Sequence, residues 1–146
     1  MNDNKKIYPV ALHCLARRDY TTLMLQKKLL QKGFSVDSVQ VALQRLIQEG
    51  LVNDERFCEA FIARRIRQCY GPVRIAAELN QQGVNKETVS SQLQQNEAVW
   101  LDCIKKIQQK KFSLSPNNVQ EKLRQTNYLQ YRGFRLDQIK EIQKIK

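Results

Sequence analysis

Positively charged side chains gather in three short stretches of the sequence. From Ala60 to Ala77 the chain has arginines and no acidic residue, and from Cys103 to Gln120 it has lysines and again no acid. A pair of arginines also ends the first expected helix. Clustered cations of this kind bind phosphates and acidic protein surfaces. Together with one arginine near the C-terminus, the candidate contact residues are Arg17, Arg18, Arg64, Arg65, Arg67, Arg74, Lys105, Lys106, Lys110, Lys111 and Arg132.

These clusters have two interpretations. Cations near the C-terminal end of a helix interact favourably with the helix dipole, by about 0.3–1 kcal/mol each, and this alone can account for such positions. Alternatively, stacked units of similar structure would lay the clusters along one side of the molecule, as a stripe that matches a periodic acidic target. The whole chain of 146 residues has a net charge of +11, which favours an acidic partner.

Residues for catalysis or metal binding do not form a recognisable set. His13 is the single histidine, and no glycine-rich loop for phosphates occurs. The acidic pair Asp54 and Glu55 is better explained by its place at the start of a helix. The sequence therefore predicts a protein that is not an enzyme and has no metal and no cofactor.

The cysteines do not have the spacing of a zinc or redox motif. Cys14, Cys58 and Cys103 fall in helical apolar patterns, and we expect them to be small core residues in a reducing cytoplasm. The sequence shows no signal peptide and no apolar stretch of membrane-spanning length. We therefore expect a cytoplasmic protein without a membrane partner.

A pattern that repeats every fifty residues positions the cations. Each of three glycines has a leucine four residues before it and an apolar residue ten residues before it. Apolar residues also stand one and six residues after each glycine. This spacing predicts a helix that ends at the glycine, a turn with positive φ, and a second helix. Ser35 and Asn85 are expected to cap the second helix in two copies. The third copy has Arg135 at this position, so its cap is either weaker or lies elsewhere. The repeated glycines are Gly33, Gly83 and Gly133.

A long helix before each of these hairpins completes three units of three helices. The long helices are expected at 7–18, from Asn53 or Asp54 onward, and at 98–111, and Ser115 with Pro116 is expected to start the last hairpin. We predict an all-α fold of three tandem three-helix repeats, at 5–50, 53–96 and 97–146, which form an elongated, curved array that is right-handed or arc-like.

Two kinds of side chain in this array leave alternatives open. Arg65 falls within an apolar stripe, so it must extend to solvent or face a partner. Aromatic rings beside the basic clusters could stack on bases, but packing explains their spacing better. These rings belong to Tyr20, Tyr70, Tyr128 and Tyr131.

Several short strings go beyond composition. They are LARRDY at 15–20, LLQKGF at 29–34, NDERF at 53–57, EAF at 59–61, GPVRI at 71–75 and YRGF at 131–134. Together these strings resemble the RecX family, the bacterial regulators of the recombinase RecA. The resemblance covers about residues 8 to 144 in the right order, and it is specific as a whole although each string alone is weak. The chain departs from the pattern by its short N-terminus and by the missing cap in the third repeat.

The resemblance implies a non-enzymatic protein that binds the RecA filament on single-stranded or double-stranded DNA, in its helical groove. It also implies inhibition of filament extension, ATP hydrolysis, strand exchange and the co-protease activity of the SOS response, and so a role in recombination and DNA repair. The matching basic positions serve either folding or contact, and the family motif does not say which. They are Arg17, Arg18, Arg64, Arg74 and Arg132.

Two other functions fit parts of the sequence. A direct DNA-binding helical module fits the charge, although Asn85–Gln95 has one lysine and no arginine to read bases. We expect weak, non-specific DNA binding in any case, and a monomer. A passive scaffold, whose charge only aids solubility, is the third possibility.

Overall fold

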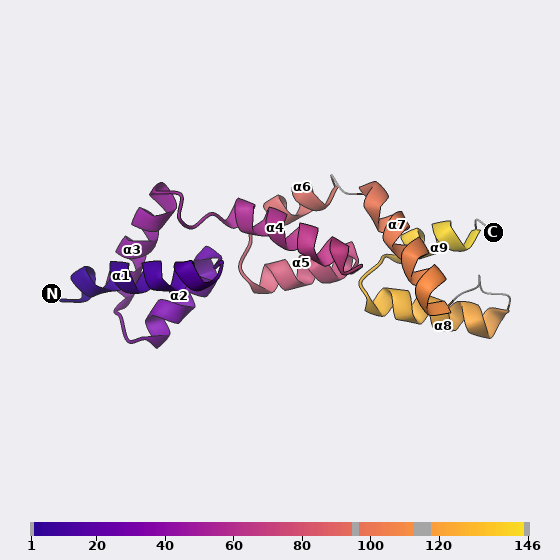
Figure 1. The fold of residues 1–146 in the computed structure, drawn as a ribbon, viewed down its shortest axis with the longest axis horizontal. Helices are drawn as coiled ribbons and strands as arrows, with labels where there is room; N and C mark the ends of the chain where they lie inside the picture. Colours follow the sequence, from indigo (N-terminus) through magenta and orange to yellow (C-terminus); the bar gives the residue numbers. More distant parts are fainter. Residues whose placement is uncertain (1, 95–96, 113–117, 145–146) are drawn as a thin grey trace.

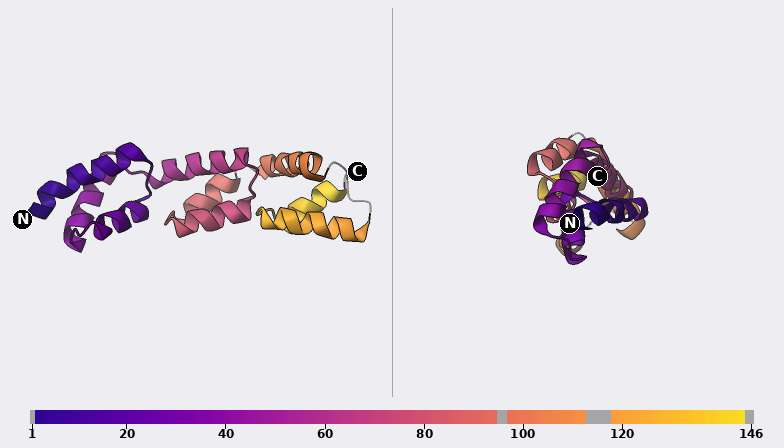
Figure 2. Two further views of the ribbon diagram at one scale, coloured as in Figure 1. Left: turned by 60° about the horizontal axis from the view of Figure 1, so that its bottom comes forward. Right: turned by 90° about the vertical axis from the view of Figure 1, so that its left-hand side faces the viewer.

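Three units of three helices follow one another along the molecule. The computed structural model describes residues 2–94, 97–112 and 118–144, which form nine α-helices and one π-helix and contain no strand. The molecule is much longer than it is wide (Figure 1). The first helices of the units run along one edge in a shallow arc, with the hairpins beside them (Figure 2). The prediction of an all-α array of three-helix repeats is confirmed.

The helix bounds show the repeat directly. In the first unit the helices are α1 (Asn2–Arg17), α2 (Thr22–Gln31) and α3 (Val36–Gln48). In the second they are α4 (Asp54–Arg67), α5 (Pro72–Gln81) and α6 (Lys86–Gln94). In the third they are α7 (Glu97–Ile107), the π-helix η1 (Gln108–Phe112), α8 (Val119–Tyr131) and α9 (Leu136–Lys144).

Each hairpin turns at the repeated glycine. Gly33, Gly83 and Gly133 have φ values of +99°, +90° and +103°, in the region that L-residues with a side chain rarely adopt. The apolar residue after each glycine donates its backbone N–H to the carbonyl of the leucine four residues before the glycine, with N···O distances of 3.1–3.4 Å. The predicted helix–turn–helix unit is therefore present in all three copies.

The third hairpin is capped by a different residue from the first two. Ser35 accepts a hydrogen bond from the Ser38 N–H at 3.2 Å, and Asn85 accepts one from the Glu87 N–H at 2.8 Å. In the third copy the side-chain oxygen of Gln138 reaches back and accepts the Arg135 N–H at 3.0 Å. This is the reciprocal half of a capping box, so the missing capping side chain is replaced from within the helix.

Other predicted bounds differ from the structure. α1 begins at Asn2 rather than Ile7, and the helix expected at 98–111 changes into a π-helix after Ile107. Ser115 is the predicted cap of the last hairpin, with Pro116 in its first turn, and both residues lie outside the described residues. The described helix α8 is capped by Asn118, which accepts the Glu121 N–H at 2.7 Å.

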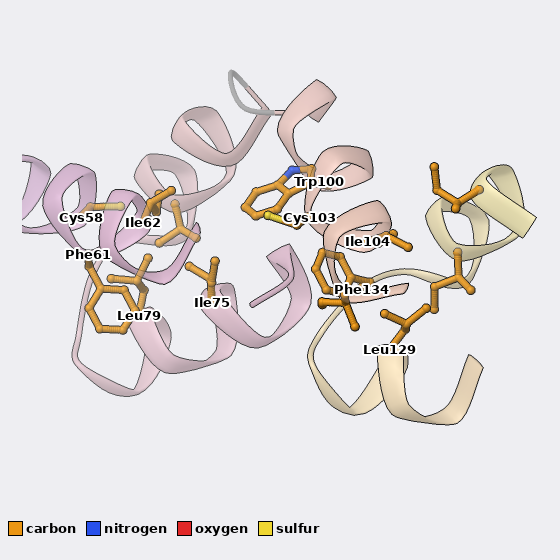
Figure 3. Packing of buried hydrophobic residues seen from close by; sticks show 14 of the residues in the cluster. Cys58, Phe61, Ile62, Ile75, Leu79, Trp100, Cys103, Ile104, Leu129 and Phe134 are labelled. Atoms are coloured by element: carbon orange, nitrogen blue, oxygen red, sulfur yellow. The ribbon is translucent and has the colours of Figure 1, made fainter. Parts of the chain in front are cut away.

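The apolar side chains form two separate cores. The first unit has its own core, centred on Leu25, Leu29 and Leu46. The second and third units share one core, in which Trp100 of α7 lies between the helices of the two units and is fully buried (Figure 3). The second and third units are consequently held together more extensively than the first and second.

The contacts between successive units recur at the fifty-residue period. The Thr21 hydroxyl donates a hydrogen bond to the carbonyl of Gln82. Fifty residues later the backbone N–H of Gly71 donates to the carbonyl of Arg132 at 2.8 Å. At each junction, the residue that precedes the first helix of one hairpin donates a hydrogen bond to the turn of the hairpin in the next unit.

The third unit lacks this docking position. α2 and α5 have ten residues each, whereas α8 has thirteen and begins three residues earlier in the repeat. The position that corresponds to Thr21 and Gly71 is Glu121, inside the first turn of α8. Its N–H is already bound by the Asn118 side chain.

Candidate anion-binding site

A cationic groove lies at the junction of the second and third units. It has a volume of about 730 Å³ and is lined by the end of α4, by α7 and η1, and by α8 with the residue that follows it. Of the eleven candidate contact residues, it brings together Arg67, Lys106, Lys110, Lys111 and Arg132. The sequence places these five residues up to 65 positions apart, and the fold puts them on one surface.

The groove combines this charge with an apolar wall. Ile66, Val99 and Ile107 contribute apolar surface, and the ring of Tyr128 lies at one side. Asp102 is the one acidic residue among the described residues that line it. Cations with little opposing charge around a partly apolar floor suit a ligand that carries several negative charges.

The π-helix η1 positions one side of the groove. It carries Lys110 and Lys111, and π-helical turns of this kind are frequent at functional sites. The Phe112 ring packs edge-on against Tyr128 with centroids 5.8 Å apart, and the Lys111 ammonium lies 4.6 Å from the Tyr128 ring centroid. The exposed side chains of Lys110 and Lys111 are thus held on a wall fixed by aromatic packing.

Two of the predicted contact residues are engaged inside the chain. The Arg65 guanidinium binds Glu78 of α5 through two hydrogen bonds, of 2.9 and 3.2 Å. Arg74 binds the same carboxylate at 3.4 Å. Arg65 and Glu78 have side chains that are only 25% and 22% exposed. Arg65 therefore neither extends freely to solvent nor requires an external partner, because it ties α4 to α5.

Arg132 joins the second and third units as well as lining the groove. Its guanidinium donates to the Cys69 carbonyl at 3.3 and 3.2 Å and to the carbonyl of Gln68, both just after the end of α4. It also lies 4.0 Å from the ring centroid of Tyr70. Part of the role of Arg132 is thus to bind orphan carbonyls at a helix end.

The remaining predicted residues lie outside the main groove. Arg18 and Arg64 line a smaller groove of about 190 Å³ at the junction of the first and second units. Arg17 and Lys105 are exposed and line neither groove. The eleven candidate residues therefore divide into a pair at one junction, a cluster of five at the other, two arginines bound to Glu78, and two exposed residues outside both grooves.

The aromatic side chains beside the cations are largely packing residues. Tyr20 and Tyr70 are half-buried, and the Tyr70 ring has the guanidinium groups of Arg65 and Arg74 at 4.9 and 4.4 Å from its centroid. Tyr131 differs, because 72% of it is exposed. The packing interpretation holds for Tyr20, Tyr70 and the half-buried Tyr128, and it fails for Tyr131.

Cysteine contributes a feature that sequence reasoning missed. Cys14, Cys58 and Cys103 are buried, as expected. Cys69 is half-buried, has a positive φ of 59°, and lines the same groove as Cys103. Gly71 and Pro72 follow closely in the sequence, and such a pair indicates a break in the helical backbone. It does not indicate that Cys103 lines the same groove as Cys69.

The described residues form neither a metal site nor a membrane-spanning helix. Across the described ranges, histidine, cysteine and acidic side chains do not come together in a group that could hold a metal ion. Within that part of the chain, every helix is too short or too polar to cross a membrane.

Known proteins resemble this chain along most of its length. Models of the first, second and third three-helix domains of RecX match residues 8–46, 53–93 and 101–142. The regulatory protein RecX of Pseudomonas syringae pv. tomato is 38% identical over 130 residues, which cover 88% of this chain and 84% of the relative. That of Halorhodospira halophila is 36% identical over 138 residues, covering 94% and 86%.

Solved structures agree with this fold. The crystal structure of RecX from Lactobacillus salivarius has a TM-score of 0.84 at 20% identity and covers 97% of this chain and 94% of its own. A second crystal structure, of a regulatory protein RecX, has a TM-score of 0.86 at 22% identity and covers 97% and 72%. The relatives are regulatory proteins, in agreement with the prediction of a non-enzymatic chain. On the three domain matches and the curated relatives together, this chain belongs to the RecX family.

Proposed function

We propose that the chain binds the RecA–DNA filament, in its helical groove, and inhibits filament extension, ATP hydrolysis, strand exchange and co-protease activity. The observation that carries this proposal is the cationic groove, where five of the predicted contact residues converge at a junction between repeat units. A filament offers both the phosphates and the repeating protein surface that an elongated basic array can match.

The mechanism needs no chemical step. A rigid body that contacts several filament subunits at once binds them in one arrangement and hinders the rearrangements that accompany ATP turnover. The shared core of the second and third units supplies such rigidity, because it holds the groove walls in fixed positions. The same proposal includes a cytoplasmic location and a monomeric state. It also keeps the unit boundaries predicted from the sequence, which are 5–50, 53–96 and 97–146.

Direct, non-specific DNA binding is the second candidate. The same groove favours it, since lysines and arginines bind phosphates without reading sequence. The affinity of a direct DNA-binding module should not increase when the recombinase coats the DNA, whereas the affinity of a filament binder should. Binding to bare and to RecA-coated single-stranded DNA at one salt concentration separates the two functions.

The test of the proposal is ATP hydrolysis by the cognate recombinase on single-stranded DNA, with the chain titrated in at moderate salt. Inhibition well below one chain per recombinase subunit would indicate blocked filament growth. Inhibition that develops only near saturation would indicate coating of the filament groove.

Charge reversal in the groove makes this test specific. The double variant Lys106→Glu, Lys110→Glu should need at least about tenfold more protein for half inhibition, which corresponds to ~1.4 kcal/mol. Lys27→Glu, Lys28→Glu on α2 is the matched control, because both lysines are exposed and lie outside both grooves. Equal inhibition by the two variants would show that net charge, and not the groove, carries the effect.

A further inference from the structure

Two cysteines from different units open onto the cationic groove. Cys69 follows α4 in the second unit, Cys103 lies on α7 in the third, and both line the groove. The Cys69 N–H donates to the Ile66 carbonyl at 2.9 Å, and the Cys103 thiol donates to the same oxygen at 3.6 Å. This shared acceptor brings together two residues that are 34 positions apart in the sequence.

The two thiols differ in access to solvent. Cys69 is half-buried, whereas Cys103 is only 3% exposed. Cys69 also adopts the left-handed backbone conformation, with φ 59°, which residues with a side chain rarely adopt. A reagent that enters the groove from solvent therefore meets Cys69 first.

The charge of the groove selects the kind of reagent. The five cations that line it raise the local concentration of anions. Small disulfides that carry carboxylates meet both requirements, because their negative charge is attracted by the groove and their disulfide bond can exchange with a cysteine thiol.

We propose that Cys69 is a modification site for anionic low-molecular-weight disulfides, and that Cys103 then displaces the adduct to link the second and third units by a disulfide. In the first step the Cys69 thiolate attacks one sulfur of the reagent, whose disulfide bond breaks. A mixed disulfide forms, and one reagent thiol leaves. In the second step the Cys103 thiolate attacks the Cys69 sulfur, and a second reagent thiol leaves. The two cysteines are oxidised, one reagent disulfide is reduced, and the two cysteine protons pass to the departing thiolates or to solvent.

The order of these steps follows from burial. Burial, and secondarily the neighbouring Cys69 thiol, raise the pKa of Cys103 to about 12. Little Cys103 thiolate is present at neutral pH, so the second step is slow and the adduct at Cys69 accumulates before the link forms.

The reaction is tested on the purified, folded full-length chain with glutathione disulfide as the anionic reagent. The neutral bis(2-hydroxyethyl) disulfide is the matched reagent control. Intact mass and peptide mapping should show an adduct on Cys69 first and a Cys69–Cys103 link later. Cys14 and Cys58 are internal controls, since both are buried within the cores, and they should stay unmodified in the same samples.

Three variants keep the proposal falsifiable. Cys103→Ser should stop at the mixed disulfide, and Cys69→Ser should abolish the early reaction. Lys106→Glu, Lys110→Glu should slow the anionic reagent by roughly tenfold and leave the neutral reagent nearly unchanged. Equal slowing of both reagents, early modification of Cys14 or Cys58, or an adduct that never closes to the link would each overturn the proposal. These readouts do not involve RecA, so they are independent of the function proposed above.

Discussion

Gly71 packs so closely against Gly133 that a Cβ atom on Gly71 would lie 2.3 Å from the Gly133 carbonyl carbon. The Gly71 backbone has φ −91° and ψ 169°, which any residue can adopt, so the glycine is required by this contact and not by its own conformation. Its N–H also donates to the Arg132 carbonyl. Gly71 therefore permits the close junction over which the second and third units share a core.

Gly71→Ala should separate this junction. The added methyl group forces the two backbones apart, and overpacking of this kind costs about 1–3 kcal/mol in the free energy of unfolding. Urea denaturation followed by circular dichroism measures the loss. Gly33→Ala is the control, because Gly33 has a positive φ but nothing within 4 Å of its added Cβ, so it reports backbone strain alone. Loss of Trp100 burial, seen by fluorescence, should accompany Gly71→Ala only; unchanged fluorescence would contradict the junction account.

Glu78→Gln should destabilise the second unit. It removes the carboxylate that both Arg65 and Arg74 bind, in a half-buried place where the guanidinium groups are less well hydrated. We expect a loss of about 1–2 kcal/mol in unfolding free energy, and a smaller loss at high salt. Glu59→Gln, at an exposed position on α4, should change stability by less than about 0.5 kcal/mol. A similar effect of both variants would mean that the Glu78 contacts contribute nothing specific.

Gln138→Met should weaken the start of α9. Methionine keeps the volume of this buried side chain but removes the oxygen that accepts the Arg135 N–H. A lost cap of this kind costs about 1 kcal/mol. Amide hydrogen exchange at Arg135 is the direct readout, and it should become faster in the variant while exchange at the Ser38 N–H, capped by Ser35, stays the same. Unchanged protection at Arg135 would exclude the capping role.

Stability should fall as the pH rises above 9. Burial raises the pKa of Cys58 to about 11 and, with help from Cys69, that of Cys103 to about 12, from an ordinary value of 9.0. Above pH 9 the unfolded chain releases these thiol protons while the folded chain keeps them, so unfolding is favoured. The slope is up to about 1.4 kcal/mol per pH unit for each thiol, until the folded pKa is reached. Cys58→Ala should show a shallower slope between pH 9 and 10.5 whatever its absolute stability, and an identical slope would contradict the shift at Cys58.

The repeat pattern predicted most of the fold because each part of it has a local cause. A glycine with positive φ ends a helix wherever it stands, and apolar spacing fixes which face is buried. The sequence left open whether the third hairpin has a weaker cap or one that lies elsewhere, because Gln138 binds backward from inside the helix. The π-helix was missed because Gln108–Phe112 reads as a continuation of the helical pattern, and the aromatic packing of Phe112 on Tyr128 depends on tertiary contacts.

The candidate site was predictable in composition but not in arrangement. Charge clusters showed which residues to consider, but not that Arg65 of α4 binds Glu78 of α5, since that pair spans two helices. The convergence of Arg67 with Lys106 and Arg132 arises from the junction between units, and a repeat pattern that describes one unit does not contain it. Cys69 and Cys103 meet for the same reason.

The extra turn at the start of α8 changes the position that docks the next hairpin in the first two units. At the two internal junctions a free donor, the Thr21 hydroxyl or the Gly71 N–H, binds the turn of the following hairpin. At the corresponding place in the third unit Asn118 has already taken the Glu121 N–H. A further three-helix unit placed there would meet a backbone N–H that is already capped, and not a free hydrogen-bond donor. The third hairpin therefore lacks the free hydrogen-bond donor with which each of the first two hairpins holds its successor.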